Sequence, residues 1–213
     1  VEAVHAGAYD FLTKPIEPEQ LFRVVAKALE RSRLLEENKR LRQLVSRQDS
    51  QGHLVGEGPA MQRLRQTIGA IAQSDYTVLI RGESGTGKEL VARLIHQTGA
   101  RTDRPFVAVN CPSIPENLLE SELFGYVKGA FTGAEKDHKG LFAAAHTGSI
   151  HLDEIGDISA AIQTKLLRCL QNCEIRPVGS NHSMNVDVRV IASTNQNLED
   201  GLHRKTFRED LYY

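Results

Sequence analysis

The chain has 213 residues, of which 40% are hydrophobic and 25% are charged, and its formal net charge is -1. These proportions are typical of a soluble globular protein with one domain of ordinary size plus appendages, and the near-neutral charge argues against electrostatic binding of nucleic acid by the chain as a whole. The three cysteines stand at unpatterned positions, which indicates a reducing, cytoplasmic location, and no apolar run is long enough to suggest a membrane partner.

The first 32 residues are expected to contain a short strand and a helix. The strand is predicted over residues 9–13 and ends at Lys14-Pro15. Pro18 is a favourable first residue for a helix, and the apolar residues of one helix face follow it: Leu21, Phe22, Val25 and Leu29. A helical pattern already runs at Val1 and no stop signal stands at Tyr213, so we expect this chain to be part of a longer protein.

Residues 27–50 are polar and charged and contain neither Gly nor Pro. Leu34, Leu41 and Val45 fit a heptad seam, and Asn38 at its a position would favour a dimer. The pattern covers only about two heptads, fewer than the three or four that make a coiled coil secure. A dimeric coiled coil and a solvated connecting helix therefore both stay open for this linker, which we place at residues 33–50.

A strand, a glycine-rich loop and a helix follow one another between residues 76 and 98. Residues 76–81 are an apolar, β-branched run typical of a buried parallel strand, and the helical pattern after the loop ends at Gly99. The loop consists of Gly82, Glu83, Ser84, Gly85, Thr86, Gly87, Lys88 and Glu89.

This loop is predicted to bind the phosphates of a nucleotide such as ATP. Its glycines allow several backbone N–H groups to point inward, the helix N-terminus adds positive potential, and Lys88 adds a full positive charge. Glu89 stands where the usual pattern has a Ser or Thr hydroxyl that ligates magnesium. A plain glycine turn between strand and helix is the alternative interpretation.

Two further elements are expected before the next loop. A helix is predicted over residues 59–72 and a second buried strand over residues 106–110. Pro115 opens another helix, which is expected to carry Leu118, Leu119 and Leu123 inward.

Residues 125–134 fit neither a strand nor a helix period, because three glycines and small residues surround a single aromatic side chain, Phe131. An aromatic residue on a glycine loop either tucks into the core or serves as a docking group for a partner. Composition alone favours the core. The central part of the loop consists of Gly129, Ala130, Phe131, Thr132, Gly133 and Ala134.

A third buried strand, residues 149–153, ends in two acids. Asp153 at the carboxyl end of a strand can hold Mg²⁺, directly or through water. Glu154 beside it can polarise a water for attack on a γ-phosphate. The two carboxylates might otherwise only cap the following turn, but together with a phosphate loop they predict the second half of a nucleotide site.

The remaining elements are a helix over residues 159–172, a hairpin over 175–188, a buried strand over 188–195 and a final segment, 207–213. Cys169 and Cys173 share a helix face and are expected to be core residues. Asn195 at the end of the last strand can sense a γ-phosphate or orient the attacking water, and is otherwise a turn former. Arg208 is a candidate arginine finger for the transferring phosphoryl group.

Taken together, residues 53–213 resemble the AAA+ domain of NtrC-type activators of sigma-54 RNA polymerase. The loop from Gly82 to Glu89 matches that family's own phosphate loop, including Glu at its last position, and residues 129–134 match its sigma-54-contacting loop. Residues 152–157, 190–195 and 207–213 resemble its magnesium and catalytic strand, its sensor strand and its arginine-finger segment. The resemblance favours the docking role for Phe131.

The resemblance implies an α/β fold, the P-loop AAA+ three-layer sandwich with a parallel sheet, and a cytoplasmic ATPase. Subunits would form a ring, usually a hexamer, with ATP and Mg²⁺ between neighbours. By this resemblance, the loop and Lys88 would bind phosphates, and Val55 and Gly56 would bind the adenine. Asp153 would bind magnesium, Glu154 would activate water, and Asn110 would restrain Glu154. Asn195 would sense the γ-phosphate, and Arg208 would contact the ATP of the adjacent subunit.

The family resemblance also implies partners. The loop of Phe131 would engage the sigma-54 RNA polymerase holoenzyme and remodel the closed promoter complex. Residues 7–15 resemble the last strand of two-component receiver domains, so residues 1–32 would be the C-terminal end of a receiver, with Lys14 as its phosphoryl-contacting lysine. A sensor histidine kinase would act on the upstream part of that receiver, and DNA would bind to a C-terminal domain beyond this chain.

Two departures from the family pattern stand out. His151 replaces a residue that is usually apolar, and a buried imidazole there needs a hydrogen-bond partner. The family's second arginine would come just after Tyr213, and its helical lid would follow. Two alternative functions stay open, which are another AAA+ remodelling ATPase and a non-enzymatic ATP-binding scaffold for signalling.

Overall fold

A computed structural model describes residues 18–19, 21–30, 33, 37 and 54–213 of the chain. The chain divides into two compact units, Val1–His53 and Leu54–Tyr213. The described residues of the first unit are helical, as predicted for the segment after Pro18. The residues of the predicted apolar face are exposed, with Phe22 at 72%: Leu21, Phe22, Val25 and Leu29. The predicted strand at 9–13, Lys14, and the seam residues Leu34, Asn38, Leu41 and Val45 lie outside the described residues.

The second unit is built on a four-stranded sheet in which all neighbouring strands are parallel. The strand order is β1-β6-β3-β2, so the two strands that carry the predicted acids and the predicted sensor, β3 and β6, lie in the middle. Parallel strands need crossover connections, which the helices provide. The strands are β1 (Val78–Arg81), β2 (Phe106–Asn110), β3 (Ser149–Asp153) and β6 (Arg189–Thr194).

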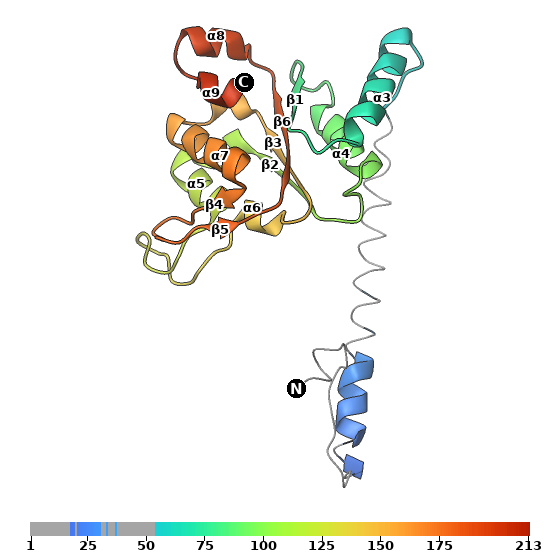
Figure 1. Cartoon of the computed structure of the whole chain (residues 1–213), viewed down its shortest axis with the longest axis vertical. Helices are drawn as coiled ribbons and strands as arrows, with labels where there is room; N and C mark the ends of the chain where they lie inside the picture. The colour runs from blue at the N-terminus through green and yellow to red at the C-terminus, as the bar shows by residue number, and fades with distance from the viewer. Residues whose placement is uncertain (1–17, 20, 31–32, 34–36, 38–53) are drawn as a thin grey trace. The chain divides into compact units, whose positions relative to one another are not determined.

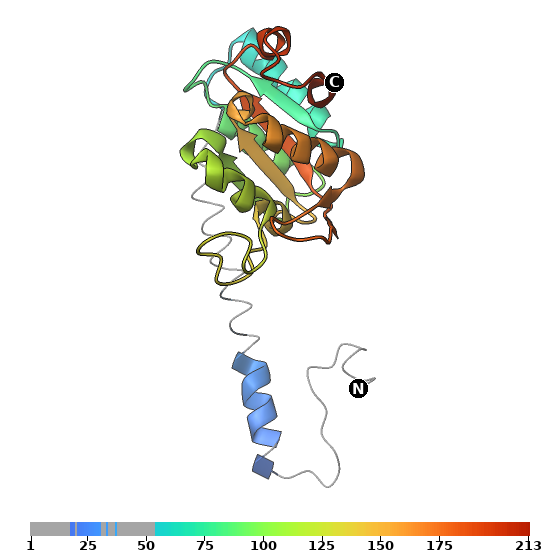
Figure 2. The same cartoon turned by 90° about the vertical axis from the view of Figure 1, so that its left-hand side faces the viewer.

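Helices cover both faces of the sheet and give the predicted three layers (Figure 1). One face carries α3 (Pro59–Ala72) and α4 (Lys88–Thr98), and the other carries α5 (Glu116–Phe124) and α7 (Ala160–Asn172). In Figure 2 the second pair of helices lies in front of the strands. The shorter elements are α6 (Leu141–Ala144), α8 (Leu198–His203), α9 (Glu209–Tyr212), the 3-10 turns η1 (Cys111–Ser113) and η2 (Ile155–Asp157), β4 (Glu174–Ile175) and β5 (Met184–Asn185).

The two layers of helices bury separate apolar clusters against the sheet. The smaller cluster joins α3 and α4 to β6 through Ile68, Ile95 and Ile191. The larger one fills the space under α5 and α7, where Phe142 is fully buried and stacks on Phe124 at 5.4 Å between ring centroids. Because strands β3 and β6 are covered on both sides, their residues are buried in succession rather than alternately, including the polar side chains of Ser149, His151 and Ser193.

Two predictions about single residues were wrong, and one about a hairpin was confirmed only in part. Leu118 is 43% exposed rather than inward, because the buried face of the short helix α5 passes through Leu119 and Leu123. Cys169 is buried as expected, but Cys173 is exposed, since it follows the last turn of α7 with a left-handed backbone (φ 54°) and leaves the helix face. The predicted hairpin at 175–188 pairs only through the two-residue strands β4 and β5.

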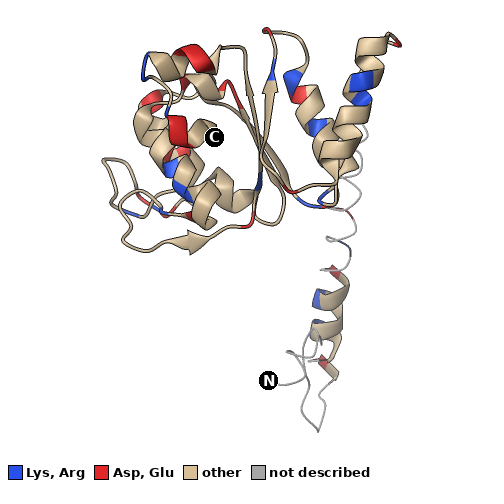
Figure 3. Cartoon of the chain, turned by 45° about the horizontal axis from the view of Figure 1, so that its top comes forward, with Lys and Arg blue, Asp and Glu red and all other residues tan. Residues whose placement is uncertain are grey.

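Positively and negatively charged residues both lie on the helices of the second unit (Figure 3). Lys and Arg lie on α3, α4 and α7, whereas α8 and α9 carry mainly Asp and Glu. This mixture agrees with the near-neutral composition. Among the described residues, no helix combines the length and the apolar character needed to cross a membrane.

Candidate functional site

The glycine loop joins the carboxyl end of β1 to the first turn of α4, as predicted. Gly85 and Gly87 have left-handed backbones, with φ of 78° and 88°, which only glycine adopts without strain. Gly87 is the N-cap residue of α4, and no side chain caps this helix end. The first N–H groups of α4 therefore stay available to an anion, and the helix dipole favours negative charge there.

Lys88 lies on the inner side of this loop with only 7% of its surface exposed. Its ammonium donates to the backbone oxygens of Gly82 at 3.1 Å and Glu83 at 3.3 Å. It also forms an ion pair of 3.1 Å with Oε1 of Glu154, whose side chain is 13% exposed. The loop thus holds a nearly buried positive charge against the predicted catalytic acid.

Glu154 follows β3 and is held from two sides. Lys88 contacts one carboxylate oxygen, and the backbone N–H of Asn195 donates to the other, Oε2, at 2.9 Å. Its own backbone is left-handed (φ 55°), a conformation that costs a non-glycine residue about 1–3 kcal/mol and is concentrated at functional sites. The carboxyl ends of β1, β3 and β6 thus bring together Lys88, Glu154 and Asn195, which the sequence had suggested separately.

Asp153 accepts hydrogen bonds on both carboxylate oxygens. The side-chain amide of Asn110 donates to Oδ2 at 3.3 Å, and the hydroxyl of Ser193 donates to Oδ1 at 2.5 Å. The expected contact of Asn110 with Glu154 is therefore not the one formed here. The reason is the strand register, because Asn110 and Asp153 are direct partners across β2 and β3.

His151 has the hydrogen-bond partner that its burial requires. Its Nε2 lies 2.7 Å from Oγ of Ser193, and only 1% of the residue is exposed. Burial lowers the pKa of His151 below its ordinary value. Ser193 was missed at the sequence level, although its place on the same sheet face as His151 is a signal that would have found it.

The donors at this site fit a nucleotide with a magnesium ion. Among the described residues, no three His, Cys, Asp or Glu side chains gather in a way that could hold a metal by themselves. Mg²⁺ does not need such a cage, since it is commonly bound by one or two carboxylates, substrate phosphates and water. Asp153 is the carboxylate in position to do this, whereas Glu89 pairs with Arg93 at 2.9 Å.

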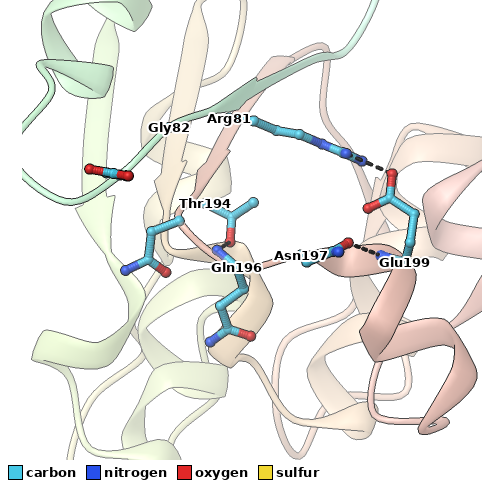
Figure 4. Close-up of a pocket in the computed structure, with 8 residues that line it drawn as sticks. Arg81, Gly82, Thr194, Gln196, Asn197 and Glu199 are labelled. Carbon is cyan, nitrogen blue, oxygen red and sulfur yellow. Dashed lines mark hydrogen bonds and ion pairs between the residues drawn. The ribbon is translucent and has the colours of Figure 1, made fainter.

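An open pocket of about 470 Å³ lies between the phosphate loop and the end of β6 (Figure 4). Arg81, the residue before the loop, reaches across it to Glu199 at 2.6 Å, and both residues contact the hydroxyl of Tyr212 at 2.7 Å. These hydrogen bonds, from Tyr212 first and then Arg81, lower the pKa of Glu199 to about 2. No local sequence pattern indicates this network, because Arg81 is more than a hundred residues from its two partners.

Arg208 lies outside this constellation. It is the N-cap residue of α9, and its guanidinium makes two hydrogen bonds to Asp210, at 2.9 and 2.6 Å. Its side chain is 42% exposed. Val55 is 88% exposed, and Gly56 lies beside the side chain of Met61. The structure therefore brings none of these three residues to Lys88 and Glu154.

The loop of Phe131 extends from the end of the domain away from the phosphate loop, next to β4 and β5 (Figure 1). Phe131 is 40% exposed and rests edge-on against Tyr126 at 4.9 Å between ring centroids. Gly129 and Gly133 have left-handed backbones, and a hydrogen bond from Gly129 N to the oxygen of Ala134 closes the turn. Ala134 is buried, Thr132 is exposed, and Ala130 lies against Gly179. The aromatic ring is thus presented on a tight turn rather than tucked into the core.

Comparison with known protein families finds one matching model, the Sigma-54 interaction domain, over residues 54–213. Among curated proteins, the transcriptional regulatory protein ZraR of Salmonella typhimurium is 49% identical over the whole of this chain, which covers 47% of ZraR. The chain spans about half the length of the curated relatives it matches.

Solved structures agree. The structure of NtrX from Brucella abortus in complex with ATP matches this chain with 41% sequence identity and a TM-score of 0.72. The match covers 99% of this chain and 44% of the NtrX chain. The P-loop NTPase domain of the sigma-54 transport activator from E. coli matches 75% of this chain, and the match covers 91% of that domain, with a TM-score of 0.50. Its identity is 18%, so it supports the fold alone.

Proposed function

The chain belongs to the family defined by the Sigma-54 interaction domain, and from this we propose that it is the motor part of an ATP-driven activator of sigma-54 RNA polymerase. One observation carries the proposal, which is the meeting of Lys88, Glu154 and Asn195 at the carboxyl ends of β1, β3 and β6. In open parallel sheets, ligands bind outside these strand ends. The whole protein would hydrolyse ATP there and use the energy at the loop of Phe131.

Each residue has a stated role in hydrolysis. The N–H groups of the loop and Lys88 hold the phosphates of ATP, and Glu154 accepts a proton from the attacking water. Asp153 holds Mg²⁺, which neutralises charge on the phosphates when bound. A γ-phosphate that pairs with Lys88 competes with Glu154 for the same ammonium, so phosphate binding and release of Glu154 are coupled. Asn195 then reports the state of Glu154 to β6.

One of the remaining roles requires a neighbouring subunit. We assign Arg208 to the ATP of the adjacent subunit in a ring, because its side chain is 42% exposed and its guanidinium contacts Asp210 and Thr164 of its own chain rather than the nucleotide site. The network of Arg81, Glu199 and Tyr212 ties the segment of Arg208 to the residue that precedes the phosphate loop. Val55 and Gly56 are assigned to the adenine side, and Asn110 to restraint of the acids through Asp153.

The loop of Phe131 is the proposed output. A partly exposed ring at the end of the domain away from the nucleotide site can engage sigma-54 without blocking catalysis. Nucleotide state would act by population shift, because the loop must bind its partner differently in the ATP and ADP states. A sensor kinase would phosphorylate a receiver, in which Lys14 would contact the phosphoryl group. A further domain would bind DNA.

The Arg208→Ala variant tests the shared site. ATP hydrolysis by the whole protein is measured against protein concentration, and we expect turnover per subunit to rise steeply as rings form and to fall by about 10³-fold in the variant. Arg204→Ala, which removes another exposed arginine of the same region, serves as the matched control and should keep its activity. Turnover that is independent of concentration and indifferent to Arg208 would mean that each subunit works alone.

A further inference from the structure

Behind Asp153 lies a buried chain of side chains that the proposed reaction does not use directly. The hydroxyl of Ser193 donates to Oδ1 of Asp153 at 2.5 Å, and Nε2 of His151 lies 2.7 Å from the same hydroxyl oxygen. His151 and Asp153 share one face of β3, because they are two residues apart on a strand. Ser193 is fully buried, and the His151 ring stacks on Phe106.

The hydrogen bonds fix the form of the imidazole. A serine hydroxyl has one proton, and here it is given to a carboxylate that can only accept. Oγ of Ser193 must therefore accept from His151, which places a proton on Nε2. Nδ1 of His151 has no hydrogen-bond partner among the described residues, so it is the bare nitrogen of the neutral ring. A second ring proton would be buried there without an acceptor.

We propose that His151 is a positioning residue for the magnesium ligand, acting on Asp153 through Ser193. This inference rests on the proposed function, in which Asp153 holds Mg²⁺. The N–H of His151 occupies the acceptor side of the Ser193 hydroxyl and so directs its proton toward Oδ1. Asn110 holds the other oxygen, Oδ2. The two hydrogen bonds fix the orientation of the carboxylate, whose remaining lone pairs would hold Mg²⁺, as hydrogen-bond partners of metal ligands commonly do.

Three substitutions separate this role from simple packing. His151→Leu replaces the imidazole by an apolar side chain of similar bulk and removes the N–H donor. Ser193→Ala removes the link itself. His151→Gln places an amide N–H at the end of a side chain that can reach Ser193, and it is the conservative variant expected to restore the effect.

The readout is the magnesium dependence of binding, not turnover. Binding of a fluorescent, non-hydrolysable ATP analogue is followed while Mg²⁺ is titrated, and again in EDTA. His151→Leu and Ser193→Ala should each raise the Mg²⁺ concentration at half-maximal effect by about 10-fold, with unchanged affinity in EDTA. His151→Gln should stay close to the wild-type protein. The double variant should be no worse than either single one, because both break the same link.

The Asp153→Asn variant separates the metal-binding role of Asp153 from the positioning role of His151. If it shifts the Mg²⁺ dependence while His151→Leu does not, the positioning role is overturned and the proposed function stands. If Asp153→Asn has no effect on Mg²⁺ dependence, the metal role of Asp153 fails and this inference fails with it. Additive effects of His151→Leu and Ser193→Ala would also overturn the inference.

A second readout needs neither metal nor nucleotide. Long-range ¹H–¹⁵N correlation spectra of the metal-free protein report which ring nitrogen of His151 is protonated. We expect the neutral ring with its proton on Nε2, and a changed Nε2 shift in Ser193→Ala. A proton on Nδ1 would contradict the hydrogen-bond chain.

Discussion

Glu154→Gln is expected to lower the rate of ATP hydrolysis by about 10²- to 10⁴-fold while nucleotide binding is retained, because the amide keeps the shape of the side chain but cannot accept the proton of water. In the structure, one oxygen of Glu154 pairs with Lys88 and the other accepts from Asn195 N, and a glutamine can preserve only part of this arrangement. Single-turnover hydrolysis and equilibrium nucleotide binding measure the two effects separately.

Glu120→Gln is the matched control for this variant. Glu120 also pairs with a lysine, Lys165, but on α5 and α7, on the face of the sheet opposite to α4. Its substitution should leave hydrolysis unchanged. Wild-type turnover in Glu154→Gln would remove Glu154 from the proposed mechanism. Transcription activation that persists in Glu154→Gln without hydrolysis would favour the non-enzymatic scaffold.

Lys88→Met is expected to weaken ATP binding by about 100-fold. The variant keeps most of the buried aliphatic stem but removes the ammonium, and a hydrogen bond to a charged group contributes about 1.5–3 kcal/mol. The ammonium donates to two backbone oxygens of the loop and pairs with Glu154, so its loss also removes these three contacts. Equilibrium binding of a fluorescent ATP analogue gives the measurement.

The control for Lys88→Met is Lys165→Met. Both lysines lie on helices and pair with a glutamate, but Lys165 is 35% exposed and pairs outside the site. A denaturant titration of each variant checks that the fold survives. Equal ATP affinity in Lys88→Met and Lys165→Met would show that the loop does not bind phosphate in the proposed way.

The order of elements around the site could be predicted because it depends on local patterns. A β-branched run, a glycine loop and a helical period predict β1, the loop and α4 from consecutive residues alone. Asp153 is the last residue of β3, Glu154 follows it and Asn195 follows β6, and parallel strands bring their carboxyl ends to one edge of the sheet. Their meeting with Lys88 therefore follows from the strand pattern.

The partners of each side chain were less predictable, because they depend on register and on contacts between distant segments. Asn110 contacts Asp153 rather than Glu154 because of the pairing of β2 with β3. Arg81 finds Glu199 and Tyr212 across more than a hundred residues, which no local pattern indicates. For His151, burial required a partner, and the structure supplied it as Ser193.

In the proposed function, ATP hydrolysis at Lys88 and Glu154 acts on sigma-54 through Phe131. The most direct test measures how many heparin-resistant open complexes sigma-54 RNA polymerase forms in the presence of ATP. The whole wild-type protein is compared with its Phe131→Ala variant. We expect ATP-dependent open complexes with the wild-type protein and at least a 10-fold loss of open complexes with Phe131→Ala. This loss corresponds to about 1.4 kcal/mol or more, as expected for an aromatic anchor that becomes buried in the interface with its partner. ATP hydrolysis should persist in that variant. Open complexes that form equally well with Phe131→Ala would contradict the proposed function.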